Sequence, residues 1–198
     1  MRTRSPSHTE TRDRILDVAR KLVIQHGHAK LSLRHVAREA GFSAPSLYEY
    51  FDSKDAIVSA IAGEVAASLR VALHRAADEA KDARGALIAL GLGYVDWARR
   101  HPHDFQLMFS RLPSKRRSLA VAAPEESPYQ IVVETVKRCH AAGPVTSGPQ
   151  RIEHIAYALW AAAHGMAMLQ LTHLAGFEAD FDSADREALE ALVTGFSL

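Results

Sequence analysis

Apolar residues recur at every third or fourth position along most of this chain, whereas strict alternation of apolar and polar residues, expected of a half-buried strand, is nearly absent. The pattern is clearest from Ile57 to Leu73, where Ile, Val or Leu stands at every fourth position. Residues spaced in this way lie on one face of an α-helix, because one turn takes about 3.6 residues. The hydrophobic pattern therefore predicts an all-α fold of about nine helices.

Helix-capping residues and glycines divide the first 55 residues into four helical segments. Ser and Thr side chains accept hydrogen bonds from the free N–H groups at a helix start, and glycine readily takes the left-handed conformation that ends many helices. Pro45 falls in the first turn of the third segment, where a missing N–H costs no hydrogen bond. The expected start and stop residues, in chain order, are Thr9 or Thr11, Gly27, Ser32, Gly41, Ser43 and Ser53.

Five further helices are expected, because the apolar periodicity resumes after each break in the sequence. The two longer breaks are the proline-containing segment 111–127 and the segment 143–149, which reads GPVTSGP. The expected helices cover about residues 85–100, 102–112, 128–142 and 150–175, and a last one begins near residue 183.

The segment from Ile155 to Phe177 contains no Asp, Glu, Lys or Arg and is long enough to span a bilayer. It also contains His164, Gln170 and Thr172, and much of the remainder is alanine, which drives membrane insertion poorly. We therefore expect a helix buried in a helical bundle, with no membrane partner. No apolar run follows the charged N-terminal residues, so we expect a cytoplasmic location without a signal peptide.

Residues 32–51, SLRHVAREAGFSAPSLYEYF, combine two short capped segments with a tight turn at Gly41. A helix-turn-helix motif requires this arrangement, because a small turn lets two helices cross and apolar residues then hold their angle. The residues expected to hold the angle are Val36, Ala37, Leu47 and Phe51, with Phe42 packing in the turn.

With Leu47 and Phe51 directed inward, the second helix of this motif would present its other residues outward. Small and hydroxyl-bearing residues at a helix start permit close approach to base edges in the major groove of DNA, and tyrosine hydroxyls can reach phosphates. The segment 43–50 offers no Arg, Lys, Asn or Gln, which are the strongest base readers. The expected outward residues are Ser43, Ala44, Ser46, Tyr48, Glu49 and Tyr50.

This window resembles the DNA-binding domain of the tetracycline-repressor (TetR) family over about residues 11–60. In that family an aromatic residue follows the turn glycine, and the next helix ends in Leu-Tyr-x-[His/Tyr]-Phe-x-x-Lys. The resemblance is specific, because eight positions agree within one short window. The matching residues are Ser32, Gly41, Phe42, Leu47, Tyr48, Tyr50, Phe51 and Lys54.

The resemblance implies a transcription repressor that binds a palindromic double-stranded DNA operator as a homodimer. Residues 1–55 would form the DNA-binding head, with 1–8 as a flexible arm, and residues 56–198 the effector-binding and dimerisation domain. We also hypothesise that Arg2, Arg4 and Arg12 enter a minor groove. The implied phosphate contacts are Ser32, Tyr48, Tyr50 and Lys54, and the implied contacts to bases or backbone are Arg34, Ser43, Ala44 and Ser46.

The body carries a weaker resemblance, from His101 to Phe109 and from Trp160 to Gly165, to one subset of the family's C-terminal domains. It implies a small-molecule effector among the fifth to eighth helices and a dimer built by the last two helices. Aromatic residues at helical spacings are also ordinary core residues, so about half of the candidates at most are expected to line a cavity. The candidates are Tyr94, Trp97, Phe105, Met108, Phe109, Tyr157, Trp160 and His164.

Composition narrows the chemistry further. The first 55 residues hold 10 of the 24 basic and 7 of the 23 acidic residues, so the head is mildly basic, as suits a surface that meets phosphates. Cys139 is the only cysteine, which excludes an internal disulfide, and His101 with His103 offers too few ligands for a metal. No G-x-S-x-G, H-E-x-x-H or phosphate-loop motif occurs, so we expect no catalytic residue, metal or cofactor.

Two alternatives remain open on the sequence alone. One is an all-helical small-molecule-binding protein or enzyme whose head has degenerated. The other is an activator, or a partner-binding adaptor, with the same fold.

Overall fold

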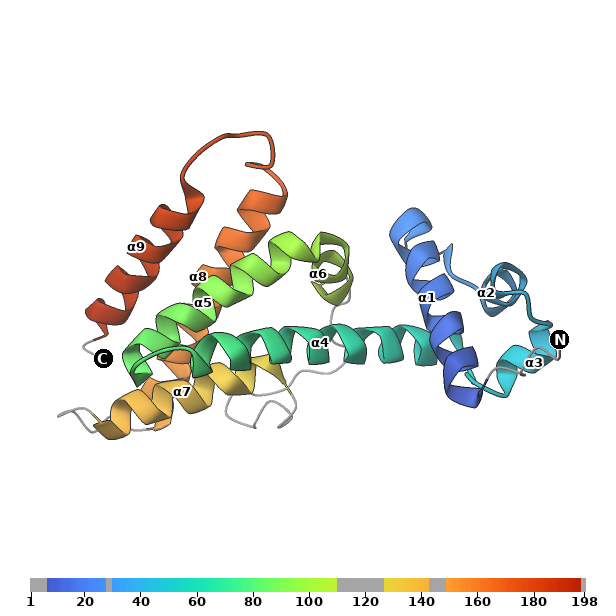
Figure 1. Cartoon of the computed structure of the whole chain (residues 1–198), viewed down its shortest axis with the longest axis horizontal. Helices are drawn as coiled ribbons and strands as arrows, with labels where there is room; N and C mark the ends of the chain where they lie inside the picture. Colours follow the sequence, from blue (N-terminus) through green and yellow to red (C-terminus); the bar gives the residue numbers. More distant parts are fainter. Residues whose placement is uncertain (1–6, 28–29, 110–126, 143–148, 197–198) are drawn as a thin grey trace, which may run out of the picture. The chain divides into compact units, whose positions relative to one another are not determined.

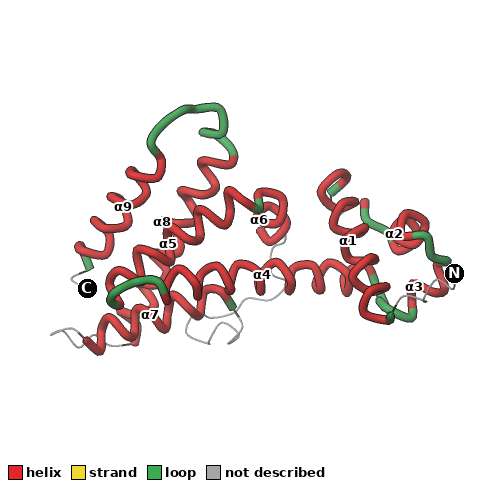
Figure 2. The backbone as a smooth tube through the Cα atoms, in the orientation of Figure 1, coloured by secondary structure: helices red, strands yellow, loops and turns green. Residues whose placement is uncertain are grey.

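The computed structural model describes residues 7–27, 30–109, 127–142 and 149–196. These residues form nine helices joined by turns and contain no strand, which confirms the all-α prediction (Figure 2). Contacts divide the chain into two compact units: Met1–Val65 with Leu107–Ser110, and Ala66–Gln106 with Arg111–Leu198. The division falls inside a helix, beyond residue 55 where the head was expected to end.

The helices follow the predicted order, with shifts of a few residues at their ends (Figure 1). They are α1 (His8–His26), α2 (Leu33–Ala40), α3 (Ala44–Tyr48), α4 (Lys54–Asp78), α5 (Ala83–Arg100), α6 (Pro102–Phe109), α7 (Pro128–Ala142), α8 (Pro149–Leu171) and α9 (Phe181–Gly195).

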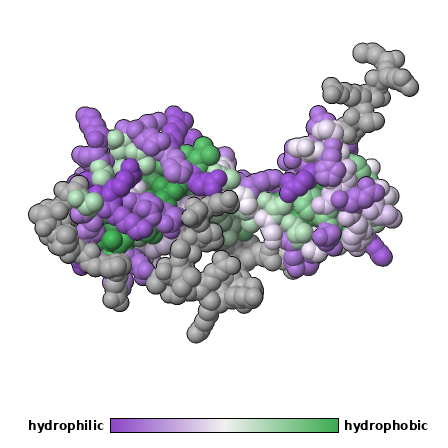
Figure 3. Space-filling model, turned by 90° about the horizontal axis from the view of Figure 1, so that it is seen from below, coloured by the Kyte–Doolittle hydropathy of each residue, from purple (hydrophilic) through white to green (hydrophobic). Residues whose placement is uncertain are grey.

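The first unit has a small apolar core to which α1, α2, α3 and the start of α4 all contribute. Ile15 and Leu16 of α1, Val36 of α2, Leu47 of α3 and Ile61 of α4 are all buried. Each of these helices therefore turns one apolar stripe inward, as the spacing of apolar residues predicts. In Figure 3 the first unit, drawn on the right, shows hydrophilic residues around a paler, weakly hydrophobic middle.

Most predicted caps of the first unit are confirmed, but the cap of α1 was wrong. Ser32 and Ser43 accept hydrogen bonds from the backbone N–H groups of His35 and Ser46, and Gly41 ends α2. The cap of α1 is Ser7 rather than Thr9 or Thr11, because Glu10 lies three residues further on. The Glu10 N–H donates to Ser7 Oγ at 3.2 Å and the Ser7 N–H donates to Glu10 Oε2 at 2.6 Å, so the pair satisfies both groups at once.

In the second unit, α5 is the central helix and packs against α7, α8 and α9 (Figure 1). Gly91 marks its closest approach to α9. A Cβ atom at position 91 would lie 2.7 Å from a terminal carbon of Leu189, whose side chain is fully buried. The absence of a side chain at Gly91 thus lets α9 lie directly against α5.

One described helix, α4, is long and apolar enough to cross a membrane by length and composition alone, with a mean hydropathy of 1.7 over its most apolar window. Core helices of soluble proteins pass the same test. Ile57, Ile61, Val65, Leu69 and Leu73 form its apolar stripe and are all buried against other parts of the protein. The charge-free segment from residue 155 forms most of α8, which packs against α5, α7 and α9 as the expected bundle helix does.

Replacing Gly41 by alanine tests the turn between α2 and α3. Gly41 has φ 75° and ψ 31°, a left-handed conformation that costs an L-residue about 1–2 kcal/mol. We expect Gly41→Ala to lower the free energy of unfolding by about that amount, measured by urea denaturation followed by circular dichroism.

The control is Gly63→Ala within α4, where a new Cβ meets no atom within 4 Å. Alanine favours helix over glycine by about 0.5–1 kcal/mol, so this variant should be more stable than the wild type. Equal stability of the two variants would contradict the role given to Gly41.

Candidate nucleic-acid interface and body pocket

The turn between α2 and α3 is closed by backbone hydrogen bonds. The Phe42 N–H donates to the Ala37 carbonyl at 2.8 Å, and the Gly41 N–H donates to the Arg38 carbonyl at 3.2 Å. These bonds satisfy the carbonyls that the end of α2 leaves free, as in the usual glycine-terminated helix. They make the connection to α3 short and well defined.

The side chains expected to hold the two helices together are buried. The helices α2 and α3 are in contact, and Val36 and Ala37 of α2 are buried, as is Leu47, the one buried residue of α3. Phe51 is also buried, directly after α3 ends. The Arg12 and Arg14 guanidinium groups of α1 lie 5.2 Å from the centre of the Phe51 ring and 5.6 Å from that of Phe42, within the range of cation–π attraction.

The other residues of α3 face outward. Tyr48 is 56% exposed, Ser43 is exposed at the helix start, and Ala44 and Ser46 are half-buried. The Ser43 and Ser46 hydroxyls lie 2.8 Å apart, and Ser43 Oγ also accepts from the Ser46 N–H. The structure thus brings Ser43, Ala44, Ser46 and Tyr48 onto one short, accessible helix.

The remaining predicted contacts surround this helix within the first unit. Ser32 and Arg34 are exposed at the start of α2, and Lys54 is half-buried at the start of α4. Tyr50 stacks on His8, with ring centres 4.6 Å apart. Sequence reasoning missed His8, because no local pattern relates the start of α1 to the residues that follow α3.

The structure corrects part of the predicted N-terminal arm, because some of its residues belong to α1. Arg12 belongs to α1 and places its guanidinium over Phe51, so it is not part of an arm. Ser7 and His8, expected in the arm, cap and begin α1. Arg2 and Arg4 lie outside the described residues.

In the second unit, four of the predicted ligand residues form one aromatic cluster. The Tyr94 hydroxyl lies 3.0 Å from His164 Nδ1, joining α5 to α8. Trp160 packs edge-on against Tyr94, with ring centres 4.8 Å apart. The ring centre of Phe105 lies 6.1 Å from that of Tyr94 and 5.3 Å from that of His164. Burial raises the pKa of Tyr94 and lowers the pKa of His164. Both groups are therefore uncharged near neutral pH.

Little open space remains inside this cluster. The cavity beside Tyr94 and Trp160 holds about 10 Å³, which is at the lower limit of what one water molecule requires. Its walls come from α4, α5, α7 and α8 and are apolar apart from the polar atoms of Tyr94 and Trp160. They are Leu73, Leu87, Leu90, Gly91, Tyr94, Val132, Leu159, Trp160 and Ala163.

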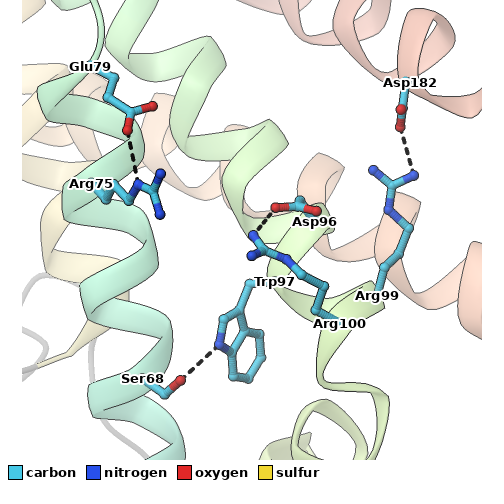
Figure 4. A network of polar contacts seen from close by, with 8 residues as sticks. All are labelled: Ser68, Arg75, Glu79, Asp96, Trp97, Arg99, Arg100 and Asp182. Carbon is cyan, nitrogen blue, oxygen red and sulfur yellow. Dashed lines mark hydrogen bonds and ion pairs between the residues drawn. The ribbon is translucent and has the colours of Figure 1, made fainter.

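The other predicted ligand residues lie elsewhere. Trp97 is buried, and its indole N–H donates to Ser68 Oγ of α4 at 3.1 Å (Figure 4). Tyr157 is 57% exposed on the surface of α8. Met108 groups with the first unit, and the side chain of Phe109 lies outside the described residues.

Two larger grooves occur on the surface of the second unit, beside α4 and α5. One, of about 600 Å³, is bordered also by α9, and the other, of about 620 Å³, includes Trp97 in its wall. Charged side chains on their rims pair with one another. Arg75 binds Glu79 at 3.0 Å and Arg100 binds Asp96. Outside the groove walls, Arg99 of α5 binds Asp182 of α9 at 2.7 Å (Figure 4).

The described residues contain no group of three or more His, Cys, Asp or Glu side chains that could hold a metal ion.

Cys139 is buried, and burial raises the pKa of its thiol. A raised pKa makes a thiol a weaker nucleophile at neutral pH, which is consistent with a packing role.

Two family profiles match the chain. The profile described as "Bacterial regulatory proteins, tetR family" matches residues 15–61, which include α2, α3 and the turn between them. The profile described as "Tetracyclin repressor-like, C-terminal domain" matches residues 87–196, from within α5 to the end of α9.

Individual relatives agree with these matches. An uncharacterised HTH-type transcriptional regulator of Haemophilus influenzae is 27% identical over 195 residues, covering 96% of this chain and 88% of its own. The nicotine-responsive transcriptional repressor HdnoR of Paenarthrobacter nicotinovorans is 25% identical over 156 residues, covering 67% and 78%. A solved structure of a protein of unknown function from Rhodococcus sp. RHA1 is 29% identical, covers 98% of both chains and has a TM-score of 0.77.

A helix-turn-helix with an exposed second helix, joined to an all-helical body, defines a DNA-binding transcriptional regulator. The chain belongs to the TetR family of such regulators. The resemblance noted in the sequence is thereby confirmed.

The burial of His164 predicts a specific pH dependence of stability. Burial holds the pKa of His164 below its ordinary value of 6.5, so the folded protein takes up this proton less readily than the unfolded chain. Its contribution to stability is complete above pH 6.5 and is lost as pH falls through the lowered pKa. We expect the free energy of unfolding to fall less between about pH 7 and pH 5 in His164→Asn than in the wild type.

The measurement is urea unfolding at a series of pH values. The control is His74→Asn, an exposed position on α4 outside the aromatic cluster, which should retain the pH dependence of the wild type. Parallel pH profiles for His164→Asn and the wild type would rule out this role for His164.

Proposed function

We propose that this protein is a homodimeric repressor that binds a palindromic operator through the exposed face of α3 and leaves it when a small molecule binds the body. The observation that carries the proposal is the geometry of α3. Leu47 is fully buried while Tyr48 is 56% exposed, so the helix is held from one side and offered to a partner on the other. An α-helix presented in this way fits the major groove of DNA.

The residues around α3 divide into two proposed roles. Tyr48, Tyr50, Lys54 and Ser32 contact phosphates, which set the register of the protein on DNA without reading its sequence. Arg34, Ser43, Ala44 and Ser46 lie near base edges, where Arg34 is the strongest candidate reader because it can pair with guanine through two hydrogen bonds. His8 supports Tyr50 by stacking on its ring.

A homodimer would place two such heads in successive major grooves, roughly 34–36 Å apart. We propose that the two copies meet through α8 and α9. Tyr157, Ala161 and Leu169 are exposed on one side of α8, opposite the buried residues that face α5 and α7. An apolar stripe left open to solvent in the single chain is what a symmetric contact between two copies requires.

The aromatic cluster of the second unit is the proposed effector site. It joins α5, α7 and α8 and holds two uncharged polar groups, Tyr94 and His164, that can exchange their mutual hydrogen bond for one to a ligand. The relative HdnoR, which is nicotine-responsive by name, makes a small organic effector reasonable.

Release from DNA needs a coupling free energy of only about 1–3 kcal/mol between the effector site and the DNA-binding site. The helix α4, to which both units contribute, is the proposed route.

We assign the protein no enzymatic activity and a cytoplasmic location, because its relatives are named as transcriptional regulators and the proposed partner is chromosomal DNA. The alternative of a ligand-binding protein with a degenerate head is disfavoured by the accessible face of α3, which retains every residue of the family pattern from Gly41 to Lys54.

The DNA interface is tested by the double variant Tyr48→Ala/Lys54→Ala. It removes two phosphate contacts from each head, so we expect operator affinity to fall on the order of 100-fold or more. Losing Lys54 alone should reduce the slope of log affinity against log salt by about 2 per dimer, since each phosphate contact contributes about 0.9. Fluorescence anisotropy with an operator fragment selected from genomic DNA measures both quantities.

The control is Lys81→Ala, which removes one exposed lysine from the second unit and should leave affinity and salt slope unchanged. Wild-type affinity in the double variant would refute the assigned interface. A wild-type protein that binds no DNA fragment selectively would instead favour the ligand-binding alternative.

The dimer interface is tested by Ala161→Arg. A long charged side chain in the middle of an apolar contact leaves its charge buried without a partner, so we expect the variant to be monomeric. Sedimentation equilibrium measures the mass directly. Val71→Arg is the matched control, because Val71 is an exposed apolar residue of α4 outside the proposed contact. A dimeric Ala161→Arg protein would place the subunit contact elsewhere.

A further inference from the structure

The indole of Trp160 is inserted between two tyrosines from other helices. Its ring centre lies 4.8 Å from that of Tyr94 on α5 and 5.6 Å from that of Tyr129 on α7, at interplanar angles of 66° and 89°. Both contacts are edge-to-face arrangements, which aromatic rings favour. One side chain of α8 thus connects three helices of the body.

Trp160 also occupies nearly all the room between these helices. Only about 10 Å³ remains beside it, too little for an effector of any size. Tyr94 and Phe105 are completely buried deeper in the cluster, whereas Trp160 is partly exposed. Of these three rings, Trp160 is the one that can move toward solvent without first opening the core.

We propose that Trp160 is a displaceable plug, and that the effector is an uncharged planar aromatic molecule about the size of indole that takes its place between Tyr94 and Tyr129. This inference rests on the proposed function, because it identifies the ligand class of the proposed effector site. The side chain holds the space in the absence of ligand, and the ligand then repeats the edge-to-face contacts that the indole makes.

The walls of the site determine the charge of the ligand. No Asp, Glu, Lys or Arg lines the cavity, so a charged ligand would lose its hydration without gaining an ionic partner. The pKa of Tyr94 is raised and that of His164 lowered, which leaves both groups neutral. Burial, and after it the negative charge of Glu153, raise the pKa of the Tyr129 hydroxyl, and that charge also disfavours an anion on this side.

Polar atoms of the cluster also suit a ligand with one or two hydrogen-bonding groups. Among the described residues, the buried Tyr129 hydroxyl has no hydrogen-bond partner. A buried hydroxyl without a partner costs roughly 1–3 kcal/mol, which a ligand with a suitably placed donor or acceptor would recover. The ring N–H or nitrogen of a heteroaromatic molecule meets this requirement without adding charge.

The tryptophan content of the chain allows the plug to be observed directly. The sequence contains two tryptophans, Trp97 and Trp160. Trp97 lines the 620 Å³ groove beside α4, and Trp160 lines the closed cluster. Labelling the full-length protein with 5-fluorotryptophan should give two ¹⁹F resonances, assigned with Trp97→Phe and Trp160→Phe. Each resonance reports on one of the two candidate sites.

The probes are indole, which is neutral, indole-3-acetate, which is an anion, and tryptamine, which is a cation. We expect indole, up to about 5 mM, to move the Trp160 resonance toward that of solvent-exposed 5-fluorotryptophan and to leave the Trp97 resonance unchanged. The two charged probes should bind at least about 10-fold more weakly, because no charged side chain lines the cavity to replace the hydration that each probe loses.

If indole leaves the Trp160 resonance unchanged, the proposal that Trp160 is displaced by a ligand is wrong. Movement of the Trp97 resonance alone would place the ligand in the groove, and binding of a charged probe as tight as that of indole would overturn the ligand class. A second variant, Trp160→Gly, leaves the plug site empty and should bind indole more tightly than the wild type does, with a rise in melting temperature. A folded Trp160→Gly protein that does not bind indole would also exclude the proposal.

Operator affinity, measured separately, keeps this inference distinct from the proposed function. If indole displaces Trp160 but leaves operator affinity unchanged, the ligand-binding site is confirmed, but its proposed role in releasing the protein from DNA is wrong. If the protein binds no operator at all, the proposed function fails while the ¹⁹F result remains interpretable.

Discussion

The chemistry of the head depends on the burial of Leu47. A helix as short as α3 has little stability of its own in water and persists because one face packs against a core. Leu47 supplies that contact within α3, and Phe51 continues it directly after the helix ends. Once these two side chains face inward, the geometry of the helix directs Tyr48 and the serines at its start outward, so a single buried contact orients the surface offered to DNA.

The body depends in the same way on contacts made by α5. This helix packs against α7, α8 and α9, and its buried residues provide Tyr94 to the aromatic cluster and Trp97 to the contact with Ser68. Tyr94 and Trp97 lie three residues apart yet point to different neighbours, because α5 is surrounded on several sides. A central helix of this kind can serve both as core and as the wall of a binding site.

Local patterns in the sequence predicted most of the fold. Hydrophobic periodicity located the helices, and Ser32, Gly41 and Ser43 marked the ends of the short ones, because capping is determined by residues only a few positions apart. The error at α1 has the same origin: Thr9 and Thr11 satisfy the general preference, but Glu10 makes Ser7 the better cap. The surface proposed to contact DNA stays a prediction from the sequence; its residues could be named because they lie within one short window.

The body site was less predictable, because its residues come together from helices distant in the chain. Periodicity marks Tyr94, Trp97, Tyr157 and Trp160 as apolar positions but cannot distinguish a shared cavity from a different neighbour or from solvent. The structure separates them: Tyr94 and Trp160 meet, Trp97 faces Ser68, and Tyr157 is exposed. The stacking of His8 on Tyr50 was beyond sequence reasoning for the same reason.

The contact between Gly91 and Leu189 has a consequence for how regulators of this kind can diverge. Any larger residue at position 91 would push α9 outward, and only a smaller residue at position 189 would let it return. Gly91 also borders the cavity beside Trp160, so a paired substitution at positions 91 and 189 would change both the shape of the proposed effector site and the packing of α9 against α5. If the proposed effector site and the proposed contact through α9 hold, ligand preference and subunit geometry are expected to evolve jointly at this point of the body.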